Sequence, residues 1–222
     1  MASKLNITAS IVIHNEIEEE LKKTINSFLH TTITKKLYLI DNSPTDILKQ
    51  TSQHPDVEYI FVGKNIGFAA GHNLIIDKIK NCSKYHLILN PDIQFNQTIL
   101  PELISSIEKR NDVALIAPKV EYPNGVLQES QRKYPKFFEL IFRFLKPSNN
   151  KLRANQLTNN IKSKNIYPDF LHGCFMLFKT DVFVKLNGFD ERYFLYMEDV
   201  DICKKIDQLG MKKMYYPTVK IT

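Results

Sequence analysis

The sequence contains no uncharged apolar run that approaches the roughly 18 residues needed to cross a membrane as a helix. The first residues lead into a strand-like segment and not into the apolar core of a secretory signal. Only three cysteines are present, an odd number without the C-x-x-C spacing of zinc or redox motifs. These absences predict a protein of the reducing cytoplasm that is soluble or at most peripheral to a membrane.

Two familiar kinds of site are also missing. Gly67 and Gly71 do not form a G-x-G-x-x-G motif and follow the third predicted strand instead of the first, which argues against a dinucleotide-binding fold. No serine or cysteine is paired with His72 or His172 as nucleophile and base. We therefore expect both histidines to be structural or solvent-facing.

Positive charge is concentrated in one segment of the chain. The net charge is +6, yet residues 132–164 hold nine lysines and arginines against a single acid, Glu139. Phenylalanines cluster at 137–146, which suits a peripheral helix on an anionic membrane surface. The alternative is that the phenylalanines pack inward and the lysines solvate a loop. Because the rest of the chain is slightly acidic and has no recognition motif, nucleic acid is not an expected partner.

Apolar segments alternate with amphipathic ones along the chain. The predicted strands are residues 7–13, 37–40, 57–62, 86–89, 113–117, 170–178 and 215–221. The predicted helices are residues 18–29, a helix ending at residue 80, residues 97–109 and residues 182–186. This order is typical of an α/β fold with a mostly parallel sheet. With 222 residues and 43% hydrophobic content, the chain can bury a full core as one domain.

Polar clusters follow three of the predicted strands, at residues 14–16, 41–46 and 90–92. Ligands of parallel sheets bind at the carboxyl ends of the strands, so these clusters predict a site. Asp92 could bind Mg²⁺ or Mn²⁺ with Asn90 as a helper, if substrate phosphates complete the coordination shell. Asp41 could accept a hydrogen bond from a base or a ribose hydroxyl. Residues 90–92 could instead be a strand-ending turn, and Asp41 could equally be a helix cap.

An acidic stretch, residues 189–201, holds five carboxylates within thirteen residues. Apolar residues recur at helical spacing from Val200, so Glu198, Asp199 and Asp201 are predicted in a first helical turn. At about 100° per residue, Asp199 points away from the other two. One carboxylate could therefore face a cleft, or all three could simply suit the positive end of a helix.

Four segments in this order resemble glycosyltransferase family 2, and within it the bacterial rhamnosyltransferase-like branch. They are SIVIHNE, LYLIDNSPTD, NIGFAAGHN followed by LILNPDI, and the long segment GCFMLFKTDVFVKLNGFDERYFLYMEDVDICKKIDQLG. The resemblance implies a single GT-A domain over residues 1–222. Residues 1–92 would be its nucleotide-sugar-binding half, and residues 93–222 its acceptor-binding half, including the basic aromatic segment 132–164.

The resemblance also implies roles for individual residues. Asp92 would be the principal metal ligand, Asp199 the general base, and Glu198 an acceptor-binding or orienting residue. The implied nucleotide-sugar contacts are His14, Asn15, Glu16, Asp41, Asn65, Asn73 and Asn90. The cofactor would be Mg²⁺ or Mn²⁺.

The implied reaction is inverting transfer of a sugar, rhamnose from dTDP-rhamnose, to a polysaccharide or lipid-linked glycan of the bacterial surface, such as O-antigen. It would occur in the cytoplasm, with peripheral contact to the inner membrane surface. One alternative is a sugar-nucleotidyltransferase, which should carry a glycine-rich, arginine-containing loop where this chain has residues 14–16. Another is an inactive relative acting at the membrane, because relatives usually carry a histidine shortly after a strand like YYPTVKIT and this sequence ends at Thr222.

Overall fold

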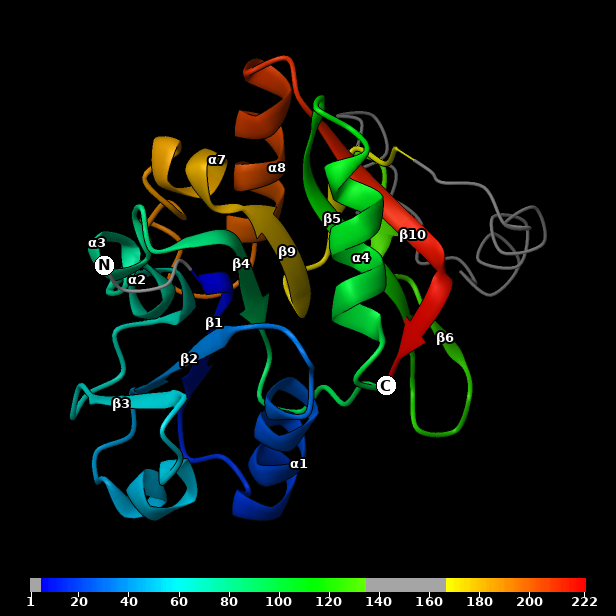
Figure 1. Cartoon of the computed structure of the whole chain (residues 1–222). Coiled ribbons are helices and arrows are strands. Elements are labelled where there is room, and N and C mark those ends of the chain that lie inside the picture. The colour runs from blue at the N-terminus through cyan, green and yellow to red at the C-terminus, as the bar shows by residue number, and fades with distance from the viewer. Residues whose placement is uncertain (1–4, 135–166) are drawn as a thin grey trace, which may run out of the picture.

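A computed structural model describes residues 5–134 and 167–222 of the chain (Figure 1). Its centre is an eight-stranded sheet ordered β10-β5-β9-β4-β1-β2-β3, with β6 paired to β5. The strands are β1 (Leu5–Ile13), β2 (Lys35–Asp41), β3 (Val57–Phe61), β4 (Ser83–Leu89), β5 (Val113–Glu121), β6 (Leu127–Gln128), β9 (Phe175–Lys179) and β10 (Lys212–Ile221). β7 (Gln131–Arg132) and β8 (Phe170–Leu171) form a separate pair.

Most neighbouring strands of the large sheet are parallel. β1 pairs in parallel with β2 and β4, β2 pairs with β3, and β10 pairs with β5. β9 is the exception, since it runs antiparallel between β4 and β5. The predicted α/β fold with a mostly parallel sheet is confirmed.

Helices cover both faces of this sheet. They are α1 (Glu18–Leu29), α2 (Phe68–Asn73), α3 (Ile76–Ile79), α4 (Ile99–Glu108), α7 (Thr180–Lys185) and α8 (Glu198–Gln208), with a 3₁₀ helix η1 at Ile47–Ser52. α1 and α4 share one apolar core, whereas α3, α7 and α8 share the other. Figure 1 shows α4 running along β5 and β10.

Alternation along the strands divides the apolar side chains between the two cores. Leu37 and Leu39 of β2 pack with α1 and α4, whereas Tyr38 and Ile40 belong to the opposite core. Successive strand residues point to opposite faces, so a strand covered on both sides is apolar throughout. Phe28 of α1 is fully buried, and burial of a side chain of this kind contributes roughly 1.5–3 kcal/mol.

Two predicted elements are wrong in detail. The helix expected to end at Lys80 is two short helices, α2 and α3, with a break at Leu74 and Ile75. The strand predicted at 170–178 is divided into β8 and β9, because the backbone N–H of Gly173 donates to the Asp199 carboxylate at 3.1 Å and not to a neighbouring strand. The second departure arises from a tertiary contact that a periodic pattern does not contain.

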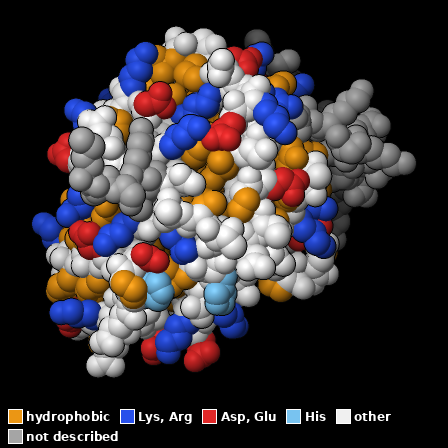
Figure 2. Space-filling view, in the orientation of Figure 1, with side chains coloured by type: hydrophobic (Ala, Val, Ile, Leu, Met, Phe, Trp, Pro, Cys, Tyr) orange, Lys and Arg blue, Asp and Glu red, His pale blue; other side chains and the backbone are white. Residues whose placement is uncertain are grey.

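Charges of both signs are mixed on the surface shown in Figure 2, where basic and acidic side chains alternate over the described residues. Within residues 5–134 and 167–222, no helix combines the length and apolarity needed to span a bilayer. Of the basic aromatic segment, Arg132 lies in β7. Residues 135–164, on which the membrane-helix interpretation depends, lie outside the described residues.

Candidate active site

The polar clusters after β1 and β4 meet in one cavity at the carboxyl ends of the parallel strands. The cavity has a volume of about 410 Å³, which is within the range of small-molecule sites. Its lining consists of Val12, Ile13, His14, Glu16, Asn42, Asn65, Gly67, Phe68, Asn90, Pro91, Asp92, Phe194 and Leu195. Five predicted residues are therefore brought together: His14, Glu16, Asn65, Asn90 and Asp92.

Glu16 and Asp92 place two carboxylates on this cavity. Burial raises the pKa of Glu16, and the charge of Asp92 raises it further, while a backbone hydrogen bond at His14 opposes the rise. Two neighbouring carboxylates repel each other unless a proton or a cation lies between them. Since the described residues contain no group of three metal-ligating side chains, a cation here would need oxygens from a ligand.

Asn90 is held by the sheet. Its backbone N–H donates to the Cys174 carbonyl at 2.9 Å, which continues the antiparallel pairing of β4 with β9 by one residue. This bond fixes the turn that presents Asp92. It also joins the end of β4 to the segment that contacts Asp199.

Asp41 has a different environment from the one expected of a nucleoside contact. Its side chain is fully buried and does not line the cavity. One carboxylate oxygen accepts the Ser43 N–H at 2.8 Å, and the other accepts the Tyr59 hydroxyl at 2.5 Å. Burial, followed by this bond to Asp41, raises the pKa of Tyr59. In the structure Asp41 therefore shapes the ends of β2 and β3, and its contact to a nucleoside stays a prediction.

Asn15 also lies outside the cavity lining. Its backbone is left-handed, with φ of 58°, and its N–H donates to the Ser43 hydroxyl at 2.9 Å. Asparagine is one of the few residues that tolerate this conformation. Asn15 and Ser43 thus join the loops after β1 and β2, which positions the neighbouring His14 and Glu16.

Asn73 acts as a clamp on the segment that leads to α8. Its amide nitrogen donates to the Phe189 carbonyl at 2.8 Å and to Glu191 at 3.0 Å, and its amide oxygen accepts the Phe189 N–H at 3.0 Å. Gly188 has φ of +68°, and a Cβ there would lie 2.1 Å from the Asn73 amide oxygen. Asn73 positions the acidic stretch but does not line the cavity.

The acidic stretch enters α8 as predicted, with Glu198, Asp199 and Asp201 in its first turn. Glu198 and Asp199 are both buried, with 5% and 8% of their surface exposed. Burial, and then the charge of Asp199, raises the pKa of Glu198. Among the described residues, one Glu198 carboxylate oxygen has no hydrogen-bond partner. A buried carboxyl group in this condition is a recognised mark of a functional site.

Asp199 lies beside the wall of the cavity. Its two carboxylate oxygens accept the N–H groups of Gly173 at 3.1 Å and Val200 at 2.8 Å. A Cβ added to Gly173 would lie 3.6 Å from the Asp199 Cβ and 3.8 Å from the ring of Phe68, a lining residue. Asp199 and Phe68 therefore both border the Gly173 position at ordinary van der Waals distance.

Cys174 lies near two of the carboxylates described above, Asp92 and Asp199. Burial raises the pKa of its thiol to about 12, and the charges of both Asp92 and Asp199 add to the rise. The thiol is therefore protonated at neutral pH and cannot act as a nucleophile. Asp92 and Asp199 are thus both close enough to Cys174 for their charges to act on its thiol.

A buried hydrogen-bonded chain supports the cavity from behind. Ser10 bonds to His72 at 2.7 Å and to His86 at 3.0 Å, and Thr8 bonds to the second nitrogen of His86 at 2.9 Å. The His72 ring lies edge-on to Phe68, with centroids 4.3 Å apart. Burial lowers the pKa of both histidines, so both are neutral. His72 is thus structural, in agreement with the sequence-based expectation.

Sequence reasoning missed several lining residues. Asn42 is buried and donates from its side chain to the Gly67 carbonyl at 3.1 Å, and Phe68 forms the wall next to Asp199. Phe194 and Leu195 also line the cavity and lie within the acidic stretch. The run of four apolar residues at 194–197 is the sequence feature that could have pointed to them.

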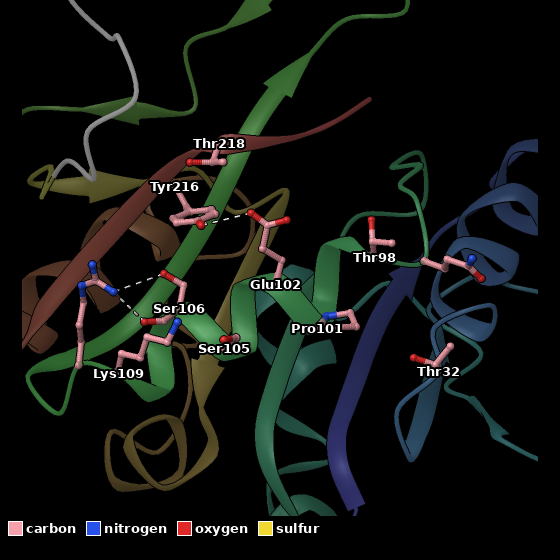
Figure 3. Close-up of a pocket in the computed structure, with 11 residues that line it drawn as sticks. Thr32, Thr98, Pro101, Glu102, Ser105, Ser106, Lys109, Tyr216 and Thr218 are labelled. Atoms are coloured by element: carbon pink, nitrogen blue, oxygen red, sulfur yellow. Dashed lines mark hydrogen bonds between the residues drawn. The ribbon is translucent and has the colours of Figure 1, made fainter.

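A larger hollow, about 670 Å³, lies between α4 and β10 (Figure 3). None of the predicted site residues line it. Its polar groups bond to one another: the Tyr216 hydroxyl donates to Glu102 at 3.2 Å, and Arg110 donates to the Ser106 carbonyl at 2.9 Å. We therefore place the active site at the smaller cavity.

Comparison with known families decides the class of the protein. Residues 8–186 match the family model described as glycosyl transferase family 2. The chain belongs to this family. It is therefore a glycosyltransferase, and the resemblance found in the sequence is confirmed.

Relatives of this glycosyltransferase include sugar transferases from bacteria and an archaeon. It is 29% identical over 218 residues to the rhamnosyltransferase WbbL of Escherichia coli K12, covering 93% of this chain and 79% of the relative. It is 24% identical over 200 residues to the N-acetylglucosaminyl-diphospho-decaprenol L-rhamnosyltransferase of Mycobacterium tuberculosis, covering 82% and 64%. The hexosyltransferase Agl10 of Haloferax volcanii is 26% identical over 201 residues, covering 87% and 59%. The chain thus spans less than two thirds of the last two relatives.

Solved structures confirm the GT-A fold of this family 2 member. GalNAc-T7, crystallised with UDP, GalNAc and Mn²⁺, superposes with a TM-score of 0.73 at 16% identity, over 100% of this chain and 44% of that one. The mannosyltransferase PcManGT of Pyrobaculum calidifontis, in complex with GDP-Man and Mn²⁺, gives 0.66 at 15% identity, over 99% and 57%. At these identities the likeness shows the fold alone.

Proposed function

We propose that this glycosyltransferase moves rhamnose from dTDP-rhamnose to a glycan or lipid-linked acceptor during synthesis of a bacterial surface polysaccharide such as O-antigen. The observation that carries the proposal is the meeting of Glu16 and Asp92 on one cavity, with Asp199 beside its Phe68 wall. The rhamnosyltransferase names of two relatives support the donor sugar, and the decaprenol in one name supports a lipid-linked acceptor.

The residues present fit a divalent metal bound with the donor. Asp92 would be its protein ligand, because it is exposed on the cavity and lies close enough to Glu16 to raise the pKa of that carboxyl. The structural neighbours were solved with Mn²⁺, which agrees with this choice. A bound Mg²⁺ or Mn²⁺ supplies Lewis-acid stabilisation of the departing nucleoside diphosphate.

Asp199 is proposed as the general base. An acceptor hydroxyl is a poor nucleophile at neutral pH, so a carboxylate that takes its proton accelerates attack by about 10²–10⁴-fold. The acceptor oxygen bonds to the anomeric carbon, while the bond from that carbon to the diphosphate oxygen breaks and its electron pair leaves with the nucleoside diphosphate. The acceptor proton passes to Asp199. Attack on the face opposite the leaving group gives inversion.

The other residues bind and position the substrates. His14, Asn65 and Asn90 line the cavity and are proposed as contacts to the nucleotide sugar. Asn15, Asp41 and Asn73 hold the surrounding loops through the hydrogen bonds described above. Glu198 is proposed to orient the acceptor. We expect the reaction to occur in the cytoplasm, at the membrane surface where a lipid-linked acceptor would be presented.

The first experiment is calorimetric titration with dTDP-, UDP- and GDP-sugars, with and without Mn²⁺ or Mg²⁺. We expect tight, metal-dependent binding of dTDP-rhamnose that is lost in Asp92→Ala. Asp77→Ala is the matched control, since Asp77 is an exposed aspartate on α3 away from the cavity lining.

Three results would contradict the proposal. Metal-dependent binding of a UDP- or GDP-sugar in place of dTDP-rhamnose would refute the donor assignment. Donor binding that is unchanged in Asp92→Ala would refute Asp92 as the metal ligand. If no nucleotide sugar binds in the presence of metal, the proposed donor-dependent transfer itself is refuted.

A further inference from the structure

Four consecutive apolar side chains are exposed at the rim of the active site. Phe194, Leu195, Tyr196 and Met197, the 194–197 loop, have 56%, 52%, 73% and 51% of their surface exposed. Other large apolar side chains that are exposed in the described residues occur singly, such as Ile17 and Ile47. Single exposed apolar residues are ordinary, whereas a contiguous run marks a binding surface.

The exposure of the loop is built into the fold. The Phe194 carbonyl accepts the Phe68 N–H at 3.0 Å, and the Met197 carbonyl accepts the Asp201 N–H at 2.9 Å. Tyr196 and Met197 both have left-handed backbones, with φ of 70° and 76°. Such conformations persist only where surrounding contacts impose them, and they cluster at ligand sites.

The position of the loop limits what can contact it. Phe194 and Leu195 line the cavity that holds Asp92, and Met197 directly precedes Glu198 and Asp199. The loop therefore lies between the proposed donor site and the proposed base. In a transferase, the molecule that must approach this place is the acceptor.

The chemistry of the loop favours a hydrocarbon chain over a sugar. Leu195 and Met197 add aliphatic surface to the rings of Phe194 and Tyr196, so the loop is not an aromatic face alone. A sugar ring also needs hydrogen-bond partners, and of these four side chains only that of Tyr196 carries a hydroxyl. Arg192, two residues before the loop in the sequence, forms an ion pair with Asp190 at 2.6 Å, so its charge is already partnered. The surface thus suits an apolar and uncharged partner.

We propose that the 194–197 loop binds the polyprenyl chain of a lipid-linked acceptor. The inference rests on the proposed transfer to a lipid-linked acceptor. It adds the residues that would bind the lipid part of that acceptor. The loop guides the chain past the rim, so that the sugar attached through its diphosphate reaches Asp199. It therefore favours acceptors with long chains over short, water-soluble ones.

The test uses Tyr196→Asn, Met197→Asn and the double variant. Asparagine tolerates the left-handed backbone better than other polar residues, so the loop keeps its path while it loses its apolar surface. Ile47→Asn is the matched control, because Ile47 is 79% exposed and lies in η1, outside the cavity lining. Neither Tyr196 nor Met197 lines the donor cavity.

Transfer is measured to N-acetylglucosaminyl diphosphate carried on decaprenol in detergent and on a single isoprene unit in water. We expect KM for the decaprenyl acceptor to rise about tenfold for each variant, because loss of one apolar contact weakens binding by about this factor. KM for the short acceptor, kcat and the donor Kd should stay within about twofold of wild type, and Ile47→Asn should match wild type.

Three outcomes would overturn the inference. An equal rise in KM for both acceptors would mean that the loop contacts the acceptor sugar. Loss of binding to neutral phospholipid vesicles, with both KM values unchanged, would mean that it contacts the bilayer. A wild-type protein that binds its donor but transfers to neither acceptor would refute the lipid-linked acceptor, whereas failure to bind any donor would refute the proposed function itself.

Discussion

Replacing Gly67 with alanine should displace the rim of the active site. Gly67 has φ of 89° and ψ of 171°, a region of backbone conformation that is almost confined to glycine. A Cβ at this position would lie 2.6 Å from the carbonyl oxygen of Phe194. Because this atom belongs to the backbone, a rotamer change cannot relieve the overlap, and the 194–197 loop must move.

The expected loss of stability has two parts. The unfavourable backbone conformation costs roughly 1–3 kcal/mol for a residue other than glycine. Movement of Phe194 also breaks the 3.0 Å hydrogen bond from the Phe68 N–H, which contributes roughly 0.5–1.5 kcal/mol. The free energy of unfolding should therefore fall by about 1.5–4.5 kcal/mol in Gly67→Ala.

Gly210→Ala separates backbone strain from the contact with the loop. Gly210 also has positive φ, at +70°, but a Cβ there would meet nothing within 4 Å. This control should lose only about 1–2 kcal/mol and bind the donor as wild type does. Donor affinity of Gly67→Ala should fall about tenfold, because Phe194 and Leu195 line the cavity.

Urea denaturation and calorimetric donor titration measure the two effects. The reasoning would be refuted if Gly67→Ala lost no more stability than Gly210→Ala and bound the donor normally. That result would mean that the loop can move without cost and does not shape the cavity.

Asp199→Asn should reduce kcat by about 10²–10⁴-fold with an unchanged donor Kd. Asp201→Asn, in the same helical turn, is the control and should retain activity. Equal losses of kcat in the two variants, measured in steady-state assays, would refute Asp199 as the base. Burial lowers the pKa of His86 to about 3, so the unfolded chain binds a proton there that the folded one does not. This group alone should lower stability by roughly 1.4 kcal/mol per pH unit as the pH drops from about 6.5. His86→Gln should show a shallower slope in denaturation between pH 6.5 and 4, and an unchanged slope would contradict this assignment. Burial raises the pKa of Glu198, so its charge destabilises the fold as the pH rises above about 4.5. Glu198→Gln should therefore be more stable than wild type at pH 8 but not at pH 4. Its rate of sugar transfer should be lower than that of wild type.

Most elements of the fold could be predicted from the sequence because their signals are local. The apolar spacing of Leu21, Ile25 and Phe28 fixed the bounds of α1, and the apolar run of β1 predicted a strand covered on both faces. The division of 170–178 into two strands could not be predicted, because it depends on a hydrogen bond from Gly173 to Asp199, 26 residues away. The antiparallel direction of β9 likewise depends on where the chain returns to the sheet.

The candidate site was predictable in part for a related reason. Glu16 and Asp92 follow strands that the parallel order brings together, so strand ends alone predicted their meeting. Asp41 lies at the end of the neighbouring strand β2, yet its carboxylate accepts hydrogen bonds from Ser43 and Tyr59 and does not line the cavity. Which end-of-strand side chain faces the cavity depends on the hydrogen bonds of adjacent loops, and these are tertiary contacts.

By itself, the sequence determined the βαβ order, the carboxylates at the strand ends, the acidic first turn of α8 and the family resemblance. These are properties of residue type and spacing along one chain. Only the tertiary structure decided that Asp92 and Asp199 both come near Cys174, that Asn73 clamps the acidic stretch, and that residues 194–197 are exposed at the rim. The physical reason is that burial, contact and charge pairing depend on distances between segments, and those distances exist only once the sheet has assembled.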